Sequence, residues 1–283
     1  MNPVQYIQER QHSWALRHGV RLDEHEWAVE LNDNLFLPLI PGAIAEFGAG
    51  AGGELDGRMR APHSSSALVV NVFHYWRLFD DVGPILAAIA PGLAVGEILG
   101  LRFEVRCPIA WPIPRGIPPH LDVVIRYRDA AEPAATKAVA VESKFAEGYG
   151  QGQGAFVASY LAPENAAIWE GMEPLRDLAD QIHRGKVLYD ELNVAQLVKH
   201  VLGLRAEFEE TRNFELVYLW YPVFGREAVR RQEEIERFRQ VAAACQPPVT
   251  FRATTYPDLI QSLAVAHGET HGAYVDYLAE RYF

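Results

Sequence analysis

The segment at residues 214–221 constrains the fold most, because it is apolar on both of its faces. Its sequence is Phe-Glu-Leu-Val-Tyr-Leu-Trp-Tyr, with a single charged side chain. A strand with one face in water alternates apolar and polar residues, whereas a nearly uninterrupted apolar run is typical of a strand covered on both faces. The segment therefore predicts the middle of a sheet that has helices packed on both sides.

Three more strands are expected upstream of this segment. The first alternates apolar and charged residues, and the next two carry longer apolar stretches separated by a turn rich in Ala, Pro and charge. These strands are predicted at 100–106, 121–127 and 138–145.

Helical patterns surround the strands. The segment 67–78 is apolar nearly all round and follows three serines that suit a helix cap, so it is expected to be a buried helix. The other expected elements are helices at 4–17, 23–31, 173–203 and 226–245, a strand at 249–254 and closing helices.

The succession helix, three strands, helix, strand predicts an α/β fold. Its central mixed sheet is flanked by helices, and helical extensions lie at the N- and C-terminal ends. We expect a single domain over 1–283, with a helical extension at 1–47, a core at 48–255 and C-terminal helices at 256–283.

Two carboxylates and one amine are expected to meet on neighbouring strands. The two-residue period of a strand places Glu142 and Lys144 on one face, beside the small residues Ala138 and Ala140. Asp122 lies in the preceding strand. If the register brings Asp122 next to Glu142, their carboxylates lie about 5 Å apart.

Such a pair of carboxylates favours the binding of a cation. Adjacent carboxylates in a half-buried place repel each other, so one of them takes up a proton unless a cation lies between them. Mg²⁺ resolves this conflict, since it prefers oxygen ligands and keeps positions open for water and phosphate. Lys144 is then placed to hold and deprotonate an attacking water. The alternative is a buried ion pair between Glu142 and Lys144 without a catalytic role.

The choice of lysine at position 144 also indicates catalysis. The chain has lysines only at 137, 144, 186 and 199, and only Lys144 has an acidic residue two positions before it. A compact, titratable amine suits a catalytic role better than a permanently charged guanidinium.

With these features the sequence resembles the PD-(D/E)XK nuclease superfamily, whose members have restriction-endonuclease-like folds. The matching pattern is Pro119-His120-Leu121-Asp122 followed by Glu142-Ser143-Lys144. One departure is that the proline stands three positions before the aspartate instead of next to it. The resemblance covers about 64–221, and it implies a core of helix, three strands, helix and strand that hydrolyses DNA or, less often, RNA with Mg²⁺.

The resemblance also implies roles for individual residues. Asp122, Glu142 and Ser143 are expected to hold Mg²⁺, for which Mn²⁺ can substitute. Lys144 is expected to position and activate the attacking water.

A further acidic ligand is expected upstream, because members of the superfamily often carry one before the three strands. Glu54 is the candidate, with Glu97 and Glu104 as rivals. Glu54 equally suits a first-turn residue that is favoured by the helix dipole.

The last candidate is a polar residue on the later helix. Gln196 and His200 align on one face at helical spacing, and Gln-x-x-x-His there looks like the superfamily, in which a polar residue often assists the site. Asn193 and Gln196 also have the spacing of a capping box, which would make both structural. Both interpretations stay open.

Composition limits the partners and the compartment. The formal net charge of −11 argues against indiscriminate binding to nucleic acid, although it leaves room for a local basic groove. The opening residues form neither a signal peptide nor a membrane anchor, and two cysteines are too few for a disulfide framework. We expect a cytoplasmic protein that does not bind membranes and acts on nucleic acid, chiefly DNA, with a homodimer as a candidate assembly.

The sequence thus predicts a metal-dependent phosphodiester hydrolase of the PD-(D/E)XK type, expected to be a deoxyribonuclease. One alternative is a catalytically inactive nuclease-fold module that binds nucleic acid or a protein partner. The acidic net charge and the open assignment of the third carboxylate motivate that alternative.

Overall fold

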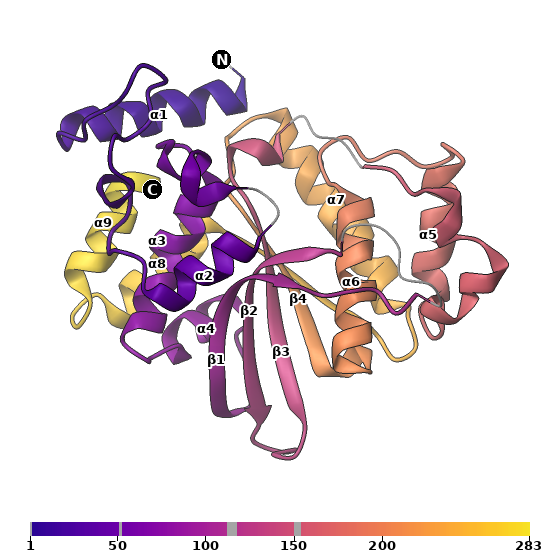
Figure 1. Ribbon diagram of the computed structural model, residues 1–283. Coiled ribbons are helices and arrows are strands. Elements are labelled where there is room, and N and C mark those ends of the chain that lie inside the picture. Colours follow the sequence, from indigo (N-terminus) through magenta and orange to yellow (C-terminus); the bar gives the residue numbers. More distant parts are fainter. Residues whose placement is uncertain (1, 51–52, 112–117, 150–153) are drawn as a thin grey trace.

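The computed structural model describes residues 2–50, 53–111, 118–149 and 154–283 (Figure 1). In these residues, the strands form one mixed sheet in the order β1-β2-β3-β4-β5. β1, β2 and β3 are antiparallel neighbours, while β3, β4 and β5 run parallel to one another. The strands are β1 (Val95–Arg106), β2 (His120–Asp129), β3 (Thr136–Lys144), β4 (Phe214–Trp220) and β5 (Thr250–Thr255). The expected α/β class and the interior position of β4 are both confirmed.

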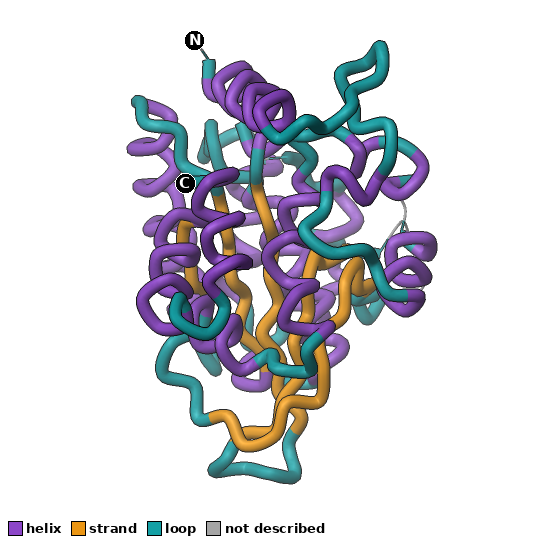
Figure 2. The backbone as a smooth tube through the Cα atoms, turned by 90° about the vertical axis from the view of Figure 1, so that its left-hand side faces the viewer, coloured by secondary structure: helices purple, strands orange, loops and turns teal. Residues whose placement is uncertain are grey.

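Helices cover both faces of the sheet (Figure 1). One layer consists of α1 (Pro3–Arg17), α2 (Pro41–Ala49), α3 (Ser65–Leu78), α4 (Gly83–Ile89), α8 (Tyr256–His267) and α9 (Gly272–Tyr282). The other consists of α5 (Glu173–His183), α6 (Val194–Phe208) and α7 (Arg226–Ala243). Figure 2 shows the first layer in front of the strands, with the turns at one end of the sheet projecting beyond the helices.

Short 3-10 helices connect these elements. They lie at Leu31–Asn34, Glu54–Asp56, Arg58–Arg60, Ala146–Gly148, Ala158–Tyr160, Pro163–Trp169 and Thr211–Asn213.

β3 contributes to both hydrophobic cores, because alternate side chains of a strand point to opposite faces. Val139 and Val141 pack in the core beneath the layer of α3 and α8, whereas Ala138 and Ala140 face the core beneath α6 and α7. All four side chains are buried. The predicted small-residue face of this strand is therefore the face that continues to Glu142 and Lys144.

The expected buried helix is confirmed as α3. Ser64 is its N-cap, and the Oγ of Ser64 accepts a hydrogen bond of 3.2 Å from the main-chain N–H of Ala67. A cap of this kind satisfies one of the donors that the first turn of a helix leaves free.

The prediction of a helix at 23–31 is wrong. The carboxylate of Asp23 accepts hydrogen bonds from the main-chain N–H groups of His25 and Trp27, at 2.9 and 3.0 Å, and Leu22 forms an isolated antiparallel bridge with Ala28. An aspartate that binds nearby main-chain donors offers them an alternative to helix formation. Asp23 thus closes a turn instead of starting a helix.

The helical stretch expected at 173–203 is two helices separated by an ordered connection. α5 ends before Gly185, which has a positive φ of 66°, a conformation that commonly follows a helix end. Beyond it, the carboxylate of Glu234 on α7 accepts hydrogen bonds from the N–H groups of Asp190, Glu191 and Leu192. This long-range contact was not visible in the local pattern.

The C-terminal helix joins the N-terminal helix through a buried arginine. Arg281 on α9 is fully buried and donates from Nε to Oε1 of Gln11 on α1 at 3.1 Å, and from Nη1 to the carbonyl oxygen of Asn34 at 2.9 Å. Arg281 therefore fixes α9 to α1 and to the segment that follows it. Within the described residues, no helix is both long and apolar enough to cross a membrane.

Candidate active site

Asp122 and Glu142 lie side by side at the end of the sheet where β2 begins and β3 finishes. Val123 pairs with Val141, so the same antiparallel register places Asp122 opposite Glu142. The Oδ2 of Asp122 accepts a hydrogen bond of 2.6 Å from the main-chain N–H of Ser143. The register is the one expected from sequence, and this hydrogen bond fixes the Asp122 carboxylate against β3.

Glu142 and Lys144 form a buried ion pair. The Nζ of Lys144 is 2.6 Å from Oε1 of Glu142, and the two residues are 9% and 2% exposed. Burial opposes the charged form of Glu142, but Lys144 and His200 outweigh it and lower the pKa of Glu142 to about 2. Burial likewise opposes the charge of Lys144, but Glu142 and the other nearby carboxylates outweigh it and raise the pKa of Lys144.

His200 is a member of the site whose contact sequence analysis did not predict. Its Nε2 lies 2.8 Å from Oε2 of Glu142, and both residues are 2% exposed. His200 comes from α6, in the helical layer opposite α3, so the two oxygens of Glu142 contact two different basic side chains. The available signal was the helical alignment of His200 with Gln196.

Glu104 is a third carboxylate whose charge acts on the predicted pair, Asp122 and Glu142. Burial, followed by the charge of Glu142, raises the pKa of Asp122 well above its usual value, and Glu104 raises it further. Burial, then Glu54, then Glu142 raise the pKa of Glu104 to about 7. Because β1 and β2 pair through Phe103 with Val123, Glu104 occupies the register position opposite Asp122.

The backbone at Glu104 adopts an unusual conformation. Its φ is +49°, in the left-handed region that residues with a side chain rarely adopt within a strand. Such conformations are costly and are commonly found at functional sites. The Oε2 of Glu104 also lies 3.8 Å from Nδ1 of His120, whose Nε2 is buried without a hydrogen-bond partner among the described residues.

The other two acidic candidates occupy different places. Glu54 lies in the 3-10 helix Glu54–Asp56, where its Oε2 accepts a hydrogen bond of 3.0 Å from the Oγ of Ser66 at the start of α3. The charge of Glu54 acts on Glu104. Glu97 lies toward the other end of β1 and forms an exposed ion pair of 3.1 Å with Arg128.

The side chain of Ser143 is bound across the sheet, and the main chain of Gln196 takes part in a helix cap. The Oγ of Ser143 lies 2.6 Å from the hydroxyl of Tyr256 on the opposite face of the sheet, so the serine side chain points away from Glu142. The N–H of Gln196 donates to Oδ1 of Asn193 at 3.0 Å, which makes Asn193 the N-cap of α6. Within the part of the chain that the structure describes, the side-chain amide of Gln196 makes no hydrogen bond.

The donor chemistry of the site fits a hard divalent cation. The carboxylates of Glu104, Asp122 and Glu142 act on one another, and the raised pKa values of Glu104 and Asp122, caused first by burial, record the cost of holding these charges together. Over the described ranges, no three His, Cys, Asp or Glu side chains are close enough to hold a metal by themselves. Mg²⁺ needs no such cage, since it is commonly held by one or two carboxylates, water and substrate phosphate.

The fold and the site together define a class of protein. A mixed sheet with the order helix, three strands, helix, strand, and with an aspartate and a Glu-x-Lys triplet on adjacent strands, is a PD-(D/E)XK-type restriction endonuclease fold. Residues 11–283 match the family described as Restriction Endonuclease associating with ARP. The chain therefore belongs to this restriction endonuclease family. Comparisons with curated proteins and with solved structures gave no match.

Proposed function

We propose that this protein is a Mg²⁺-dependent hydrolase of phosphodiester bonds in DNA. The observation that supports the proposal most strongly is the placement of Asp122, Glu142 and Lys144 at one end of two adjacent strands, with 2.6 Å between Glu142 and Lys144. Membership in a restriction endonuclease family adds support from the whole chain, because that family typically uses a divalent metal and acts on DNA.

Asp122 and Glu142 would hold the cation, together with the main-chain carbonyl of Ser143. The hydroxyl of Ser143 is bound to Tyr256 across the sheet, so the main chain is the part of Ser143 that remains for this role. A bound Mg²⁺ would supply positive charge at the scissile phosphate and make a nearby water a stronger acid. Mn²⁺ would substitute for it, because both ions accept carboxylate and water oxygens.

Lys144 would act on the phosphate and on the attacking water. Its Nζ is bound to Glu142 and its side chain is nearly buried. The ion pair and the burial thus restrict the orientation of the ammonium group. An ammonium in such a place donates hydrogen bonds and offsets the negative charge that builds on the phosphate. His200 would hold the second oxygen of Glu142 and so keep the carboxylate oriented.

Cleavage of plasmid DNA tests the proposal. Wild-type protein with Mg²⁺ is expected to cut DNA, and Lys144→Ala or Asp122→Asn is expected to reduce the rate by about 100-fold or more. Lys137→Ala is the matched control, because Lys137 lies on the same strand but pairs with Asp129 at the other end of the sheet. Thermal unfolding of each variant shows that it is folded.

The contradicting outcomes are distinct. Equal cutting by the wild type and both site variants would place the activity elsewhere. Metal-independent binding of DNA or of a protein partner by wild-type protein that never cuts would favour the inactive nuclease-fold module.

A further inference from the structure

A cavity of about 390 Å³ opens beside the candidate active site. We call it the side pocket, and the lining residues that matter here are Trp27, Glu54, Arg58, His63, Ser65 and Glu147. It adjoins the site because its lining residue Glu147 lies in the 3-10 helix Ala146–Gly148, directly after the end of β3 at Lys144, and the charge of Glu54 acts on Glu104. Its volume lies in the range of about 300 to 1,000 Å³ that is usual for small-molecule sites.

The lining offers one flat aromatic surface and several polar groups. Trp27 is half-buried, and its indole packs against a nearby segment of the same chain. A Cβ at Gly57 would lie 3.3 Å from the indole, and the guanidinium carbon of Arg60 lies 5.9 Å from the ring centroid. Arg58 and His63 supply hydrogen-bond donors, while Glu54 and Glu147 supply acceptors. A ligand complementary to this pocket has a flat ring that stacks on Trp27 and carries hydrogen-bond donors and acceptors on its edge. A nucleobase has both features.

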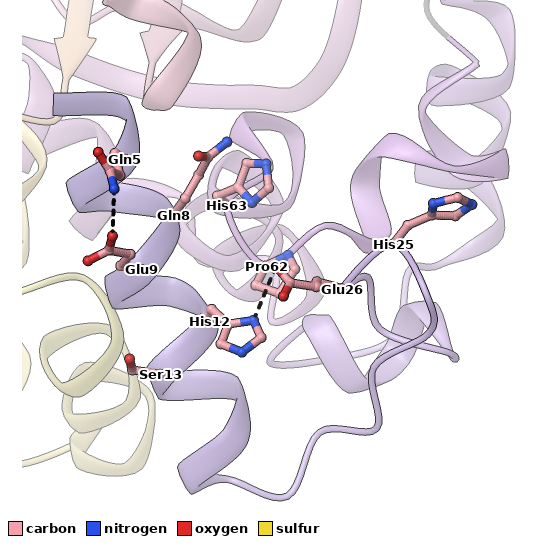
Figure 3. Close-up of a pocket in the computed structure, with 9 residues that line it drawn as sticks. All are labelled: Gln5, Gln8, Glu9, His12, Ser13, His25, Glu26, Pro62 and His63. Atoms are coloured by element: carbon pink, nitrogen blue, oxygen red, sulfur yellow. Dashed lines mark hydrogen bonds and ion pairs between the residues drawn. The ribbon is translucent and has the colours of Figure 1, made fainter. Parts of the chain in front are cut away.

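A second cavity continues the side pocket away from the site. Its volume is about 550 Å³, it lies between α1 and the segments at 25–26 and 62–63, and it shares His63 with the side pocket. Figure 3 shows Gln8 and His12 of α1 on the same side as His63. It also carries two carboxylates: Glu9 accepts a hydrogen bond from Nε2 of Gln5 at 2.9 Å, and Glu26 lies 3.7 Å from Nδ1 of His12. The two cavities together therefore give a polar path that leads away from the site.

We propose that the side pocket binds one unpaired nucleobase, stacked on Trp27, next to the scissile phosphate. The preferred substrate would then be DNA with an unpaired nucleotide at the cutting position and not a regular duplex. A base inside a duplex exposes only its edges, so an aromatic side chain in a pocket reaches its face only when the base is extruded or single-stranded. This inference rests on the proposed function, because it assigns the substrate of the same site.

DNA binding by the Lys144→Ala protein tests the pocket without cleavage. Fluorescence anisotropy at one fixed salt concentration compares a single strand, a fully paired duplex and a duplex with one unpaired nucleotide. Adding Trp27→Ala is expected to weaken binding of the single strand and the interrupted duplex about 10-fold and to change binding of the paired duplex less than about twofold. Trp27→Phe, which keeps an aromatic face, is expected to restore most of the lost affinity.

Two controls keep the result interpretable. Trp111→Ala removes a half-buried indole that does not line the side pocket and is expected to change no affinity. Trp27→Ala leaves in place the two hydrogen bonds that the main chain of residue 27 makes with Asp23, one with its carboxylate and one with its N–H, and the melting temperature of the variant checks this.

The outcomes separate this inference from the proposed function. Equal weakening on all three DNAs, or none, would overturn the side pocket as a base site while leaving the nuclease proposal standing. Loss of binding restricted to the DNAs with unpaired bases supports the pocket even if no metal produces cleavage. Failure of the Lys144→Ala protein to bind any of the three DNAs would overturn both.

Discussion

The Nε2 of His200 lies 2.8 Å from Oε2 of Glu142, and both residues are almost completely buried. This contact joins α6 to the end of β3, and it orients a carboxylate whose other oxygen binds Lys144. Truncating a partner of a buried charge leaves that charge incompletely compensated. Such substitutions cause some of the larger losses in the free energy of unfolding.

His200→Ala is accordingly expected to lower the free energy of unfolding by about 2 to 4 kcal/mol, measured by urea denaturation. The matched control is His18→Ala, because His18 pairs with Glu280 at 2.9 Å on the surface, where both side chains are more than a third exposed. That control is expected to cost less than about 1 kcal/mol. Equal losses for the two variants would show that burial of the His200 contact has no special weight.

Glu104 makes stability depend on pH. Burial, Glu54 and Glu142 raise its pKa to about 7, so the folded state favours its protonated form. A group whose pKa is raised on folding contributes stability that is complete below its unfolded pKa, near 4.5, and is lost as pH rises toward 7. Without divalent metal, wild-type protein is therefore expected to lose stability relative to Glu104→Gln over this interval, by an amount of the order of 3 kcal/mol.

Thermal unfolding in a chelator at a series of pH values measures this difference. Glu97→Gln is the control, because Glu97 lies on the same strand in an exposed ion pair. A constant gap between the wild type and Glu104→Gln from pH 4 to pH 8 would contradict the assignment of a raised pKa to Glu104.

Arg281 is expected to be the most sensitive position outside the site. It is fully buried, and its guanidinium donates to Gln11, Asn34, the carbonyl oxygen of Pro62 and the hydroxyl of Tyr277. Arg281→Ala removes donors from several buried acceptors at once and is expected to destabilise the protein by about 3 kcal/mol or more.

Urea denaturation checks the Arg281 prediction against Arg226→Ala, an exposed arginine at the start of α7 that is expected to change stability by less than about 0.5 kcal/mol. Arg281→Lys is expected to lie between the two, because an ammonium keeps the charge but cannot reproduce the planar set of donors. A loss for Arg281→Ala no larger than that of the Arg226 control would contradict a fixing role for α9.

Strand periodicity predicted that Glu142 and Lys144 share one face of their strand, and the meeting with Asp122 depended on the register. In a strand the direction of each side chain follows from its position, so a pair of adjacent strands in the right register fixes which groups share a face. The observed pairing of Val123 with Val141 is the register that the prediction required.

The rest of the site depends on contacts between distant segments. Glu104 lies opposite Asp122 because β1 pairs with β2 in one particular register, and strand alternation does not predict its left-handed backbone conformation. His200 contributes because α6 packs against the sheet at one particular height, and Asp23 forms a turn because its carboxylate binds local donors. Sequence patterns describe local preference, whereas these three outcomes are decided by tertiary packing or by competition for hydrogen bonds.

Titration calorimetry with Mn²⁺ tests the central claim most directly, since it measures whether the paired strands hold a divalent cation. The wild type is expected to bind Mn²⁺ with release of protons, because burial and the charge of Glu142 raise the pKa of Asp122 and a bound cation favours its ionised form. Asp122→Asn is expected to abolish this binding, and Glu97→Gln is expected to leave it unchanged. Equal Mn²⁺ binding by the wild type and Asp122→Asn, or none by the wild type, would contradict the assignment of Asp122 and Glu142 as a metal site.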